Sequence, residues 1–206
     1  MAAILLVLFI SVNTEHKSAF QGSLQKASGD QETTFFSKEI ETLLTEATGK
    51  LSEAIQNATI IDRVRESNQK HSKISVAELL EIDKKWRATT GADSFIESFL
   101  RNDVALQLLK FQKNNLGFSE IFVTDMYGAN VGQTNKTTDF YQADEAWWTD
   151  SFDEGRGKIL HGEIEFDESA QTVAISLYVP ILDPDLLKVI GVAKGVFNLD
   201  VLKSKL

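Results

Sequence analysis

The sequence predicts an α+β domain in which a long N-terminal helix and further helices pack on a five-stranded antiparallel sheet. Three observations predict it. Apolar residues recur every three or four positions through the first half of the chain, which is the helical period. After Gly117 the pattern changes to an alternation of apolar and polar residues, which is typical of strands. Short turn sequences join the predicted strands, and strands joined by tight turns must be antiparallel.

Length, charge and cysteine content restrict the number of domains, the partners and the metal sites that this chain can have. The 206 residues are enough for one sizeable core, and a second domain would be cramped. A net charge of −9, with no cluster of Lys and Arg, argues against a nucleic-acid partner. The absence of cysteine excludes disulfides and Cys-ligated metals. The three histidines lie far apart in the sequence, so neither a metal site nor a cofactor is predicted.

Residues 1–14 differ from the rest of the chain, because none is charged and Ala2–Phe9 is entirely apolar. The run is shorter than the roughly 20 residues that cross a membrane. It also lacks the basic segment and cleavage site of a secretory signal. Three interpretations stay open: a truncated membrane anchor, an unusual signal remnant, and a buried strand or helix. We favour the anchor, and we expect residues 15–206 to form a single domain.

An apolar stripe predicts one long helix over residues 15–65. Its members are Phe36, Ile40, Leu43, Leu44, Ala47, Leu51, Ala54, Ile55, Ala58 and Ile61. Such a stripe is either buried within one subunit or pairs two copies into a homodimer through the N-terminal helix, and both alternatives stay open.

Two further helices are predicted before the sheet. Ser75 and Glu78 form a capping box, which starts a helix that runs to about Arg87. Another helix spans roughly Val104–Lys113, and Asn115 and Gly117 after it predict a left-handed stop.

The five predicted strands are Phe118–Thr124, Asn130–Thr134, Ile159–Phe166, Thr172–Val179 and Val189–Phe197, which together make a sheet region over residues 116–202. A turn joins the first two strands, with Gly128 at a positive φ and Asp125 accepting hydrogen bonds from the turn's own amides. A short helix is predicted between the second and third strands. Pro180 falls just beyond the fourth strand, where its missing N–H is tolerated.

The second half of the chain resembles a known family. It carries, in this order, Asp139-Phe140-Tyr141-Gln142, Glu145-x-Trp147-Trp148, a Gly-Arg-Gly step, Asp167-Glu168-Ser169 and Ile190-Gly191-Val192. This set resembles the Cache sensor domains of bacterial chemoreceptors and sensor histidine kinases. The resemblance implies a PAS-like sheet with a small-molecule pocket on one face, roofed by the segment between strands two and three. It also implies membrane anchoring, an extracytoplasmic (periplasmic) position and a cytoplasmic signalling module in the full-length receptor.

The chain departs from the amino-acid-binding branch of these domains. That branch carries an Arg-x-Trp-Tyr element in the roof, whereas this sequence reads Asp144-Glu145-Ala146-Trp147-Trp148, without an arginine. The resemblance therefore does not extend to amino-acid specificity. The predicted ligand is a small molecule such as an organic acid or an amine.

The candidate ligand-binding residues are Phe140, Tyr141, Gln142, Glu145, Trp147, Trp148, Ser176 and Tyr178. A recognition pocket needs concave apolar area with a few placed polar groups, and residues 139–148 supply both. Trp147 and Trp148 point about 100° apart on a helix. We expect one to pack into the core and the other to line the pocket; the alternative is that both anchor the helix to the sheet. Ser176 and Tyr178 share one face of their strand, opposite an aliphatic face expected to pack on the long helix.

The third strand carries His161, Glu163 and Glu165 on one side. We interpret the two acids as the solvated side of an edge strand. If His161 faces the pocket, ligand binding depends on pH in the range of about 6–7.

The sequence thus predicts an extracytoplasmic small-molecule sensor domain of a transmembrane receptor, acting in chemotaxis or two-component signalling, and not an enzyme. Two alternatives stay open. The first is a periplasmic protein-interaction module without a metabolite ligand. The second is a hydrolase that uses a carboxylate pair such as Glu163 and Asp167. The hydrolase is disfavoured because no nucleophile–base set stands out.

Overall fold

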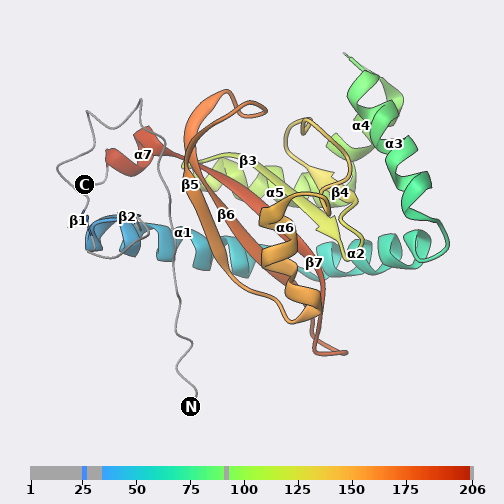
Figure 1. Ribbon diagram of the computed structural model, residues 1–206, viewed down its shortest axis with the longest axis horizontal. Helices are drawn as coiled ribbons and strands as arrows, with labels where there is room; N and C mark the ends of the chain where they lie inside the picture. The colour runs from blue at the N-terminus through green and yellow to red at the C-terminus, as the bar shows by residue number, and fades with distance from the viewer. Residues whose placement is uncertain (1–24, 27–33, 91–92, 205–206) are drawn as a thin grey trace.

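The computed structural model describes residues 25–26, 34–90 and 93–204, and the predicted anchor or signal segment at residues 1–14 lies outside them. Five antiparallel strands form an open sheet in the order β4-β3-β7-β6-β5. Helices cover both faces of this sheet (Figure 1). The α+β class and the PAS-like antiparallel sheet are therefore as the sequence predicts.

The strands are β3 (Phe118–Asp125), β4 (Asn130–Gln133), β5 (Leu160–Asp167), β6 (Thr172–Asp183) and β7 (Lys188–Asn198), and two short strands, β1 (Gln25–Lys26) and β2 (Thr34–Phe35), pair separately. Strand β6 runs past its predicted end and includes Pro180. Because β5 begins at Leu160, opposite Tyr178, the part of β6 that holds Pro180 has no β5 partner. A residue without an N–H is tolerated at such an unpaired edge.

One face of the sheet is covered by α1 (Lys38–Ile55), α2 (Ala58–His71) and α5 (Asp103–Asn114). In Figure 1, α1 and α2 run end to end across this face. The main core lies here, where the predicted apolar stripe meets the aliphatic side of the strands. Its members include Ile40, Leu44, Leu51, Ile55, Ile61, Ile121, Val123, Ile175, Leu177 and Val179. The stripe and the aliphatic face of β6 are confirmed except at Ala58 and Val173, which are exposed.

The long helix predicted over residues 15–65 is instead two helices in the described part of the chain. Helix α1 begins at Lys38, after Ser37, whose hydroxyl accepts a hydrogen bond from the Ile40 amide. Helix α2 follows Asn57, which is extended and accepts a hydrogen bond from the Thr59 amide at 2.9 Å. An N-cap of this kind satisfies a free amide of a new helix. The apolar period continues across the break, so periodicity alone does not reveal it.

The remaining helices are α3 (Val76–Ala88), α4 (Ser94–Leu100), α6 (Ala146–Phe152), the short 3-10 helix η3 (Asp153–Gly155) and α7 (Leu199–Lys203). The capping box of Ser75 and Glu78 is confirmed at the start of α3. Gly128 has the expected positive φ of 77°. The left-handed stop predicted at Asn115 and Gly117 is wrong, since neither residue has a positive φ. A Cβ at Gly117 would lie 2.3 Å from the Phe197 ring, so glycine is needed for the close approach of that ring.

A second hydrophobic cluster lies beyond the β4 edge of the sheet. It consists of Leu79, Trp86, Ile96, Ala129 and Phe140, contributed mainly by α3, α4 and the segment after β4. Helix α6 lies on the other face of the sheet, over β6 and β7 (Figure 1). Within the described residues, no helix has the length and apolar character that crossing a membrane requires.

Candidate ligand-binding site

A cavity of about 530 Å³ lies between α6 and the face of the sheet that points away from α1. We call it the α6 cavity. Residues of β5, β6 and β7 form its floor, and residues 138–150, which include the start of α6, form its roof. This volume is typical of small-molecule pockets.

Two aromatic rings form the centre of the α6 cavity. Trp147 of the roof stacks on Tyr178 of the floor, with ring centroids 5.0 Å apart and planes inclined by 17°. The rings of Phe122 and Trp147 form an edge-to-face pair with centroids 5.9 Å apart. Gly162 leaves room for the hydroxyl of Tyr178, since a Cβ at this position would lie 2.8 Å from it. The pairing joins the roof to the sheet.

The neighbouring residue, Trp148, has a structural role. Trp148 is buried, and its indole N–H donates a hydrogen bond of 2.8 Å to the Thr124 hydroxyl of β3. Its ring stacks on Phe152 with centroids 4.7 Å apart. Trp148 therefore anchors α6 to the sheet, and Trp147 lines the cavity.

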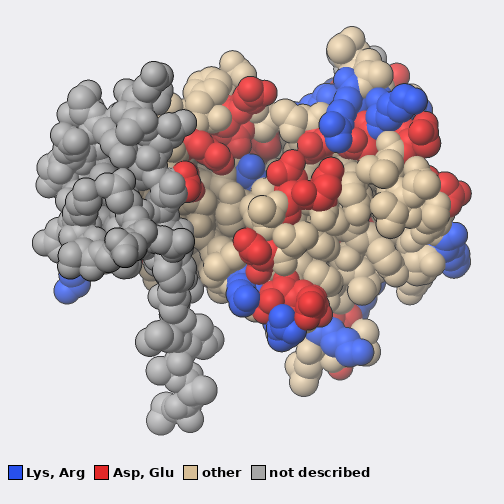
Figure 2. Space-filling model, in the orientation of Figure 1, with Lys and Arg blue, Asp and Glu red and all other residues tan. Residues whose placement is uncertain are grey.

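The walls of the α6 cavity are acidic. Among the described residues that line it, five are carboxylates and one is a lysine: Asp139, Glu145, Asp150, Glu163, Glu165 and Lys194. Figure 2 shows acidic side chains gathered around the middle of the same face of the molecule. The cavity thus carries an excess of negative charge.

Neighbouring groups determine how much charge the residues of the α6 cavity carry. Lys194 Nζ lies 3.5 Å from Asp167 Oδ2 and 5.7 Å from the centroid of the Trp147 ring, so a carboxylate outside the lining offsets its charge. Burial raises the pKa of Asp139, and the charges of Asp83 and Asp144 add to this effect. Burial, followed by the charge of Glu165, raises the pKa of Tyr178, which therefore stays a neutral phenol.

The structure brings together half of the residues predicted for the site. Gln142, Glu145, Trp147 and Tyr178 line the α6 cavity, and Ser176 is buried on the same face of β6. Phe140, Tyr141 and Trp148 do not line it. Phe140 lies 5.8 Å from Trp86 in the second cluster, and Tyr141 packs against that cluster.

A β-bulge explains what sequence reasoning missed on β5. The pairing with β6 shifts between His161, opposite Leu177, and Ile164, opposite Ile175. His161 therefore points toward α1, with its Nε2 3.8 Å from Glu41 Oε2 and its ring 5.8 Å from that of Phe36 just before the helix, and it does not line the cavity. Glu165, opposite Ala174, shares the cavity face. The isolated Gly162 inside the strand was the available signal, because such glycines often mark bulges.

Asp167, one member of the carboxylate pair considered for a hydrolase, has a lowered pKa. Burial opposes ionisation of Asp167, but the Ala170 amide, the Lys194 ammonium and the Ser169 hydroxyl outweigh it and lower its pKa. A general acid needs a raised pKa to hold its proton near neutral pH. Asp167 has the opposite property.

Comparisons with known proteins match solved structures only. No protein-family profile and no curated protein matches the sequence. The ligand-binding domain of the Campylobacter jejuni chemoreceptor Tlp3, solved with L-valine, is similar over 81% of this chain and 64% of its own, with 13% identity and a TM-score of 0.41. The sensor domain of the Vibrio cholerae histidine kinase DctB is similar over 81% and 60%, with 13% identity and a TM-score of 0.38.

The Escherichia coli DcuS sensor domain is similar over 63% of this chain and 92% of its own, with 17% identity and a TM-score of 0.36. All three are sensor or ligand-binding domains. The chain spans less than two thirds of the length of the Tlp3 and DctB domains.

Proposed function

We propose that this chain is the Cache-type sensing domain of a membrane-anchored receptor, located on the extracytoplasmic face of the membrane, and that its α6 cavity binds a small organic cation such as an amine. The observation that carries the proposal is the α6 cavity, in which the stacked rings of Trp147 and Tyr178 are surrounded by carboxylates. Aromatic faces and carboxylates both attract cations.

The lysine in the lining does not reverse this preference. The ammonium of Lys194 already faces Asp167, whereas Asp139 has a pKa that burial and nearby acids raise. A bound cation relieves that repulsion and favours the ionised form of Asp139. An organic anion would add to the repulsion, so we rank the amine above the organic acid.

The fold offers a route from ligand to membrane. Strands β6 and β7 form the floor of the α6 cavity with one face and pack on α1 with the other. A ligand that prefers one arrangement of roof and floor shifts the population toward that arrangement. We propose that this shift passes through the N-terminal helices to a cytoplasmic chemotaxis or two-component module. The apolar stripe of these helices is buried against their own sheet, so a homodimer would have to use their exposed side.

A thermal-unfolding comparison of charge-matched compounds tests the ligand class. Choline and putrescine should raise the Tm of the domain, whereas acetate and succinate should leave it unchanged. At a concentration of 100 times Kd the stabilisation is about 2.7 kcal/mol. For a chain of this size, that corresponds to roughly 5–10 °C. Stabilisation by the anions alone would contradict the cation assignment. Unchanged Tm with every small molecule would favour a protein-interaction module.

Two tryptophan variants locate the site. Trp147→Ala should lower the Tm of the free domain, because it removes the stack on Tyr178, and should lose the ligand-dependent increase, because it removes a wall of the cavity. Trp148→Phe is the matched control. It loses the hydrogen bond to Thr124 and should lower the Tm of the free domain, yet keep the increase with ligand. The reverse pattern would exclude Trp147 from the site.

A further inference from the structure

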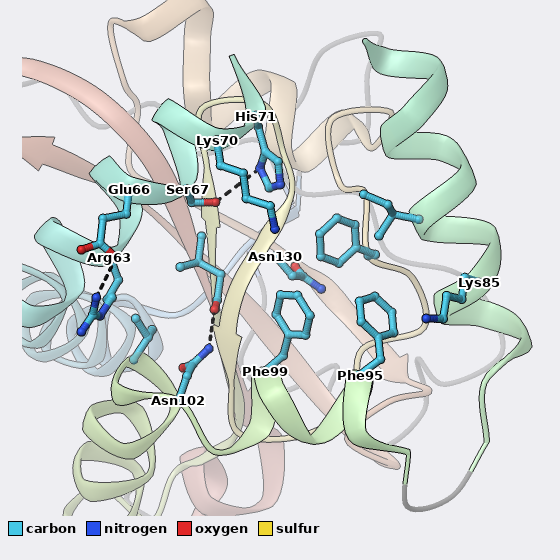
Figure 3. Close-up of a pocket in the computed structure, with 14 residues that line it drawn as sticks. Arg63, Glu66, Ser67, Lys70, His71, Lys85, Phe95, Phe99, Asn102 and Asn130 are labelled. Carbon is cyan, nitrogen blue, oxygen red and sulfur yellow. Dashed lines mark hydrogen bonds and ion pairs between the residues drawn. The ribbon is translucent and has the colours of Figure 1, made fainter. Parts of the chain in front are cut away.

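A second cavity, of about 390 Å³, lies at the seam between the main core and the second cluster, where α2, α3, α4 and β4 meet (Figure 3). We call it the seam cavity. Val131 belongs to the main core, Phe140 to the second cluster, and the rings of Phe95 and Phe99 pack against the second cluster. Phe95 and Phe99 are only partly buried, so they leave apolar surface uncovered in the cavity.

A buried acceptor without a partner lines the seam cavity. Asn130 is 1% exposed, and its side-chain Nδ2 donates to the Thr137 hydroxyl at 2.8 Å and to the Asp139 carbonyl at 3.1 Å. The Thr137 hydroxyl donates to that same carbonyl, so it can only accept from Asn130. The amide orientation is therefore fixed. The Oδ1 atom of Asn130 has no hydrogen-bond partner among the described residues. A buried carbonyl oxygen of this kind requires a donor.

Two lysines supply a positive charge at the seam cavity. Lys70 of α2 and Lys85 of α3 both line it, and neither forms an ion pair with a residue that the structure describes. The Lys85 ammonium lies 4.5 Å from the centroid of the Phe95 ring. Figure 3 shows the two side chains reaching the cavity from different helices, with the phenyl rings and the Asn130 amide between them.

The acid in the lining does not neutralise these lysines. Glu66 Oε2 lies 2.7 Å from Arg63 Nη1, and the same guanidinium also binds Asp103 at 2.8 Å. Arg63 is thus shared by two carboxylates, of which Glu66 lines the cavity and Asp103 does not. Among the described residues that line the cavity, Lys70 and Lys85 are the cations without a carboxylate partner.

We propose that the seam cavity is a binding site for a small apolar organic anion that also carries an N–H or O–H donor. The apolar body covers Phe95 and Phe99, the anionic group lies between the two lysines, and the donor satisfies Asn130. The site is separate from the α6 cavity and selects the opposite charge. It therefore stands whether or not the α6 cavity binds an amine.

Probes of one shape separate the three elements of the proposal. Indole-3-acetate has a carboxylate, a ring and an N–H; naphthalene-1-acetate lacks the donor, and indole-3-acetamide lacks the charge. Titration followed by ¹H–¹⁵N NMR should shift the Asn130 side-chain amide and the amides of Phe95 and Phe99, and leave the Trp147 indole unchanged. Leaving the buried acceptor unpaired should weaken binding of naphthalene-1-acetate roughly tenfold.

Lysine variants test the charge. The double variant Lys70→Gln/Lys85→Gln should weaken indole-3-acetate binding about fivefold, because it removes two exposed ion pairs between a lysine and the ligand carboxylate. Lys84→Gln, with a side chain 78% exposed on the same helix and outside the lining, should change it less than about twofold. The proposal is overturned if no carboxylate probe binds at millimolar concentration, if indole-3-acetamide binds as tightly as indole-3-acetate, if the double variant keeps full affinity, or if the shifts appear at Trp147 instead.

Discussion

Replacing Glu120 with glutamine tests the electrostatics of the sheet face beneath the α6 cavity. Glu120 lies on β3 and is 1% exposed. Its Oε1 accepts a hydrogen bond of 3.0 Å from the Ser169 hydroxyl, which also lies 2.7 Å from Asp167. The hydroxyl of Ser169 has one proton, so it can donate a hydrogen bond to only one of these two carboxyl groups at a time. If Glu120 is protonated, its own O–H donates to Ser169 and the serine donates to Asp167, so the chain is complete.

The pKa of Glu120 gives the magnitude. Burial, with the charge of Asp167 adding to it, raises this pKa from 4.5 to about 7. The folded state therefore binds the proton more tightly than the unfolded state, and stability falls as pH rises between these values. At 1.36 kcal/mol per pKa unit, the loss between about pH 4.5 and about pH 8 is about 3 kcal/mol. Glutamine resembles the protonated acid, so Glu120→Gln should escape this loss.

Urea unfolding followed by tryptophan fluorescence, repeated across this pH range, measures the difference. Wild type and Glu120→Gln should have similar free energies of unfolding at the acidic end, and the variant should be more stable by about 3 kcal/mol at the alkaline end. Glu46→Gln, on the exposed surface of α1, should follow wild type within about 0.5 kcal/mol throughout. A Glu120→Gln difference that is constant with pH, or a variant less stable than wild type at the alkaline end, would refute the reasoning.

Three further predictions follow from local geometry. Ser75→Ala should lower the free energy of unfolding by about 1 kcal/mol in urea, because it removes the N-cap of α3. Gly128→Ala should lower the free energy of unfolding by about 2 kcal/mol or more, since φ is 77° and a Cβ would lie 2.5 Å from Ala143 Cβ. Gly49→Ala, with open space around this position in α1, should raise the free energy of unfolding by about 1 kcal/mol. Calorimetry should find that choline binds more weakly as the pH falls toward the raised pKa of Asp139, because protonation of this carboxyl group removes negative charge from the cavity.

Local chemistry explains why most of the fold could be predicted. The strands alternate because one face of the sheet packs on α1, and the turn at Gly128 and the capping box at Ser75 are encoded within four residues. The break between α1 and α2 was missed because Asn57 restarts the helix without disturbing the apolar period. The sequence predicts Pro180 beyond the end of its strand, whereas it lies within β6. A proline is tolerated there because β5 begins opposite Tyr178, and this pairing depends on the tertiary structure.

The candidate site was harder to predict, since it depends on which way side chains face. Adjacent tryptophans point in different directions on any helix, but the packing of Trp148 on Thr124 decides which one reaches the cavity. The bulge after His161 turned that side chain toward α1 and left Glu165 on the cavity face. Lys194 sits among aliphatic residues of β7, and only its pairing opposite Tyr178 places it in the site.

The β3–β4 turn links the two cavities physically. Asp125 accepts hydrogen bonds from the turn amides of Tyr127 and Ala129, and its other oxygen lies 2.5 Å from Nδ1 of His71, which lines the seam cavity. The carbonyl of Gly128 in this turn accepts a hydrogen bond of 2.8 Å from the Gln142 amide, and Gln142 lines the α6 cavity. A ligand that displaces α2 at the seam cavity therefore acts on the same turn that holds the roof of the α6 cavity. Any resulting change in affinity must be equal in both directions, because coupling between two binding sites is reciprocal.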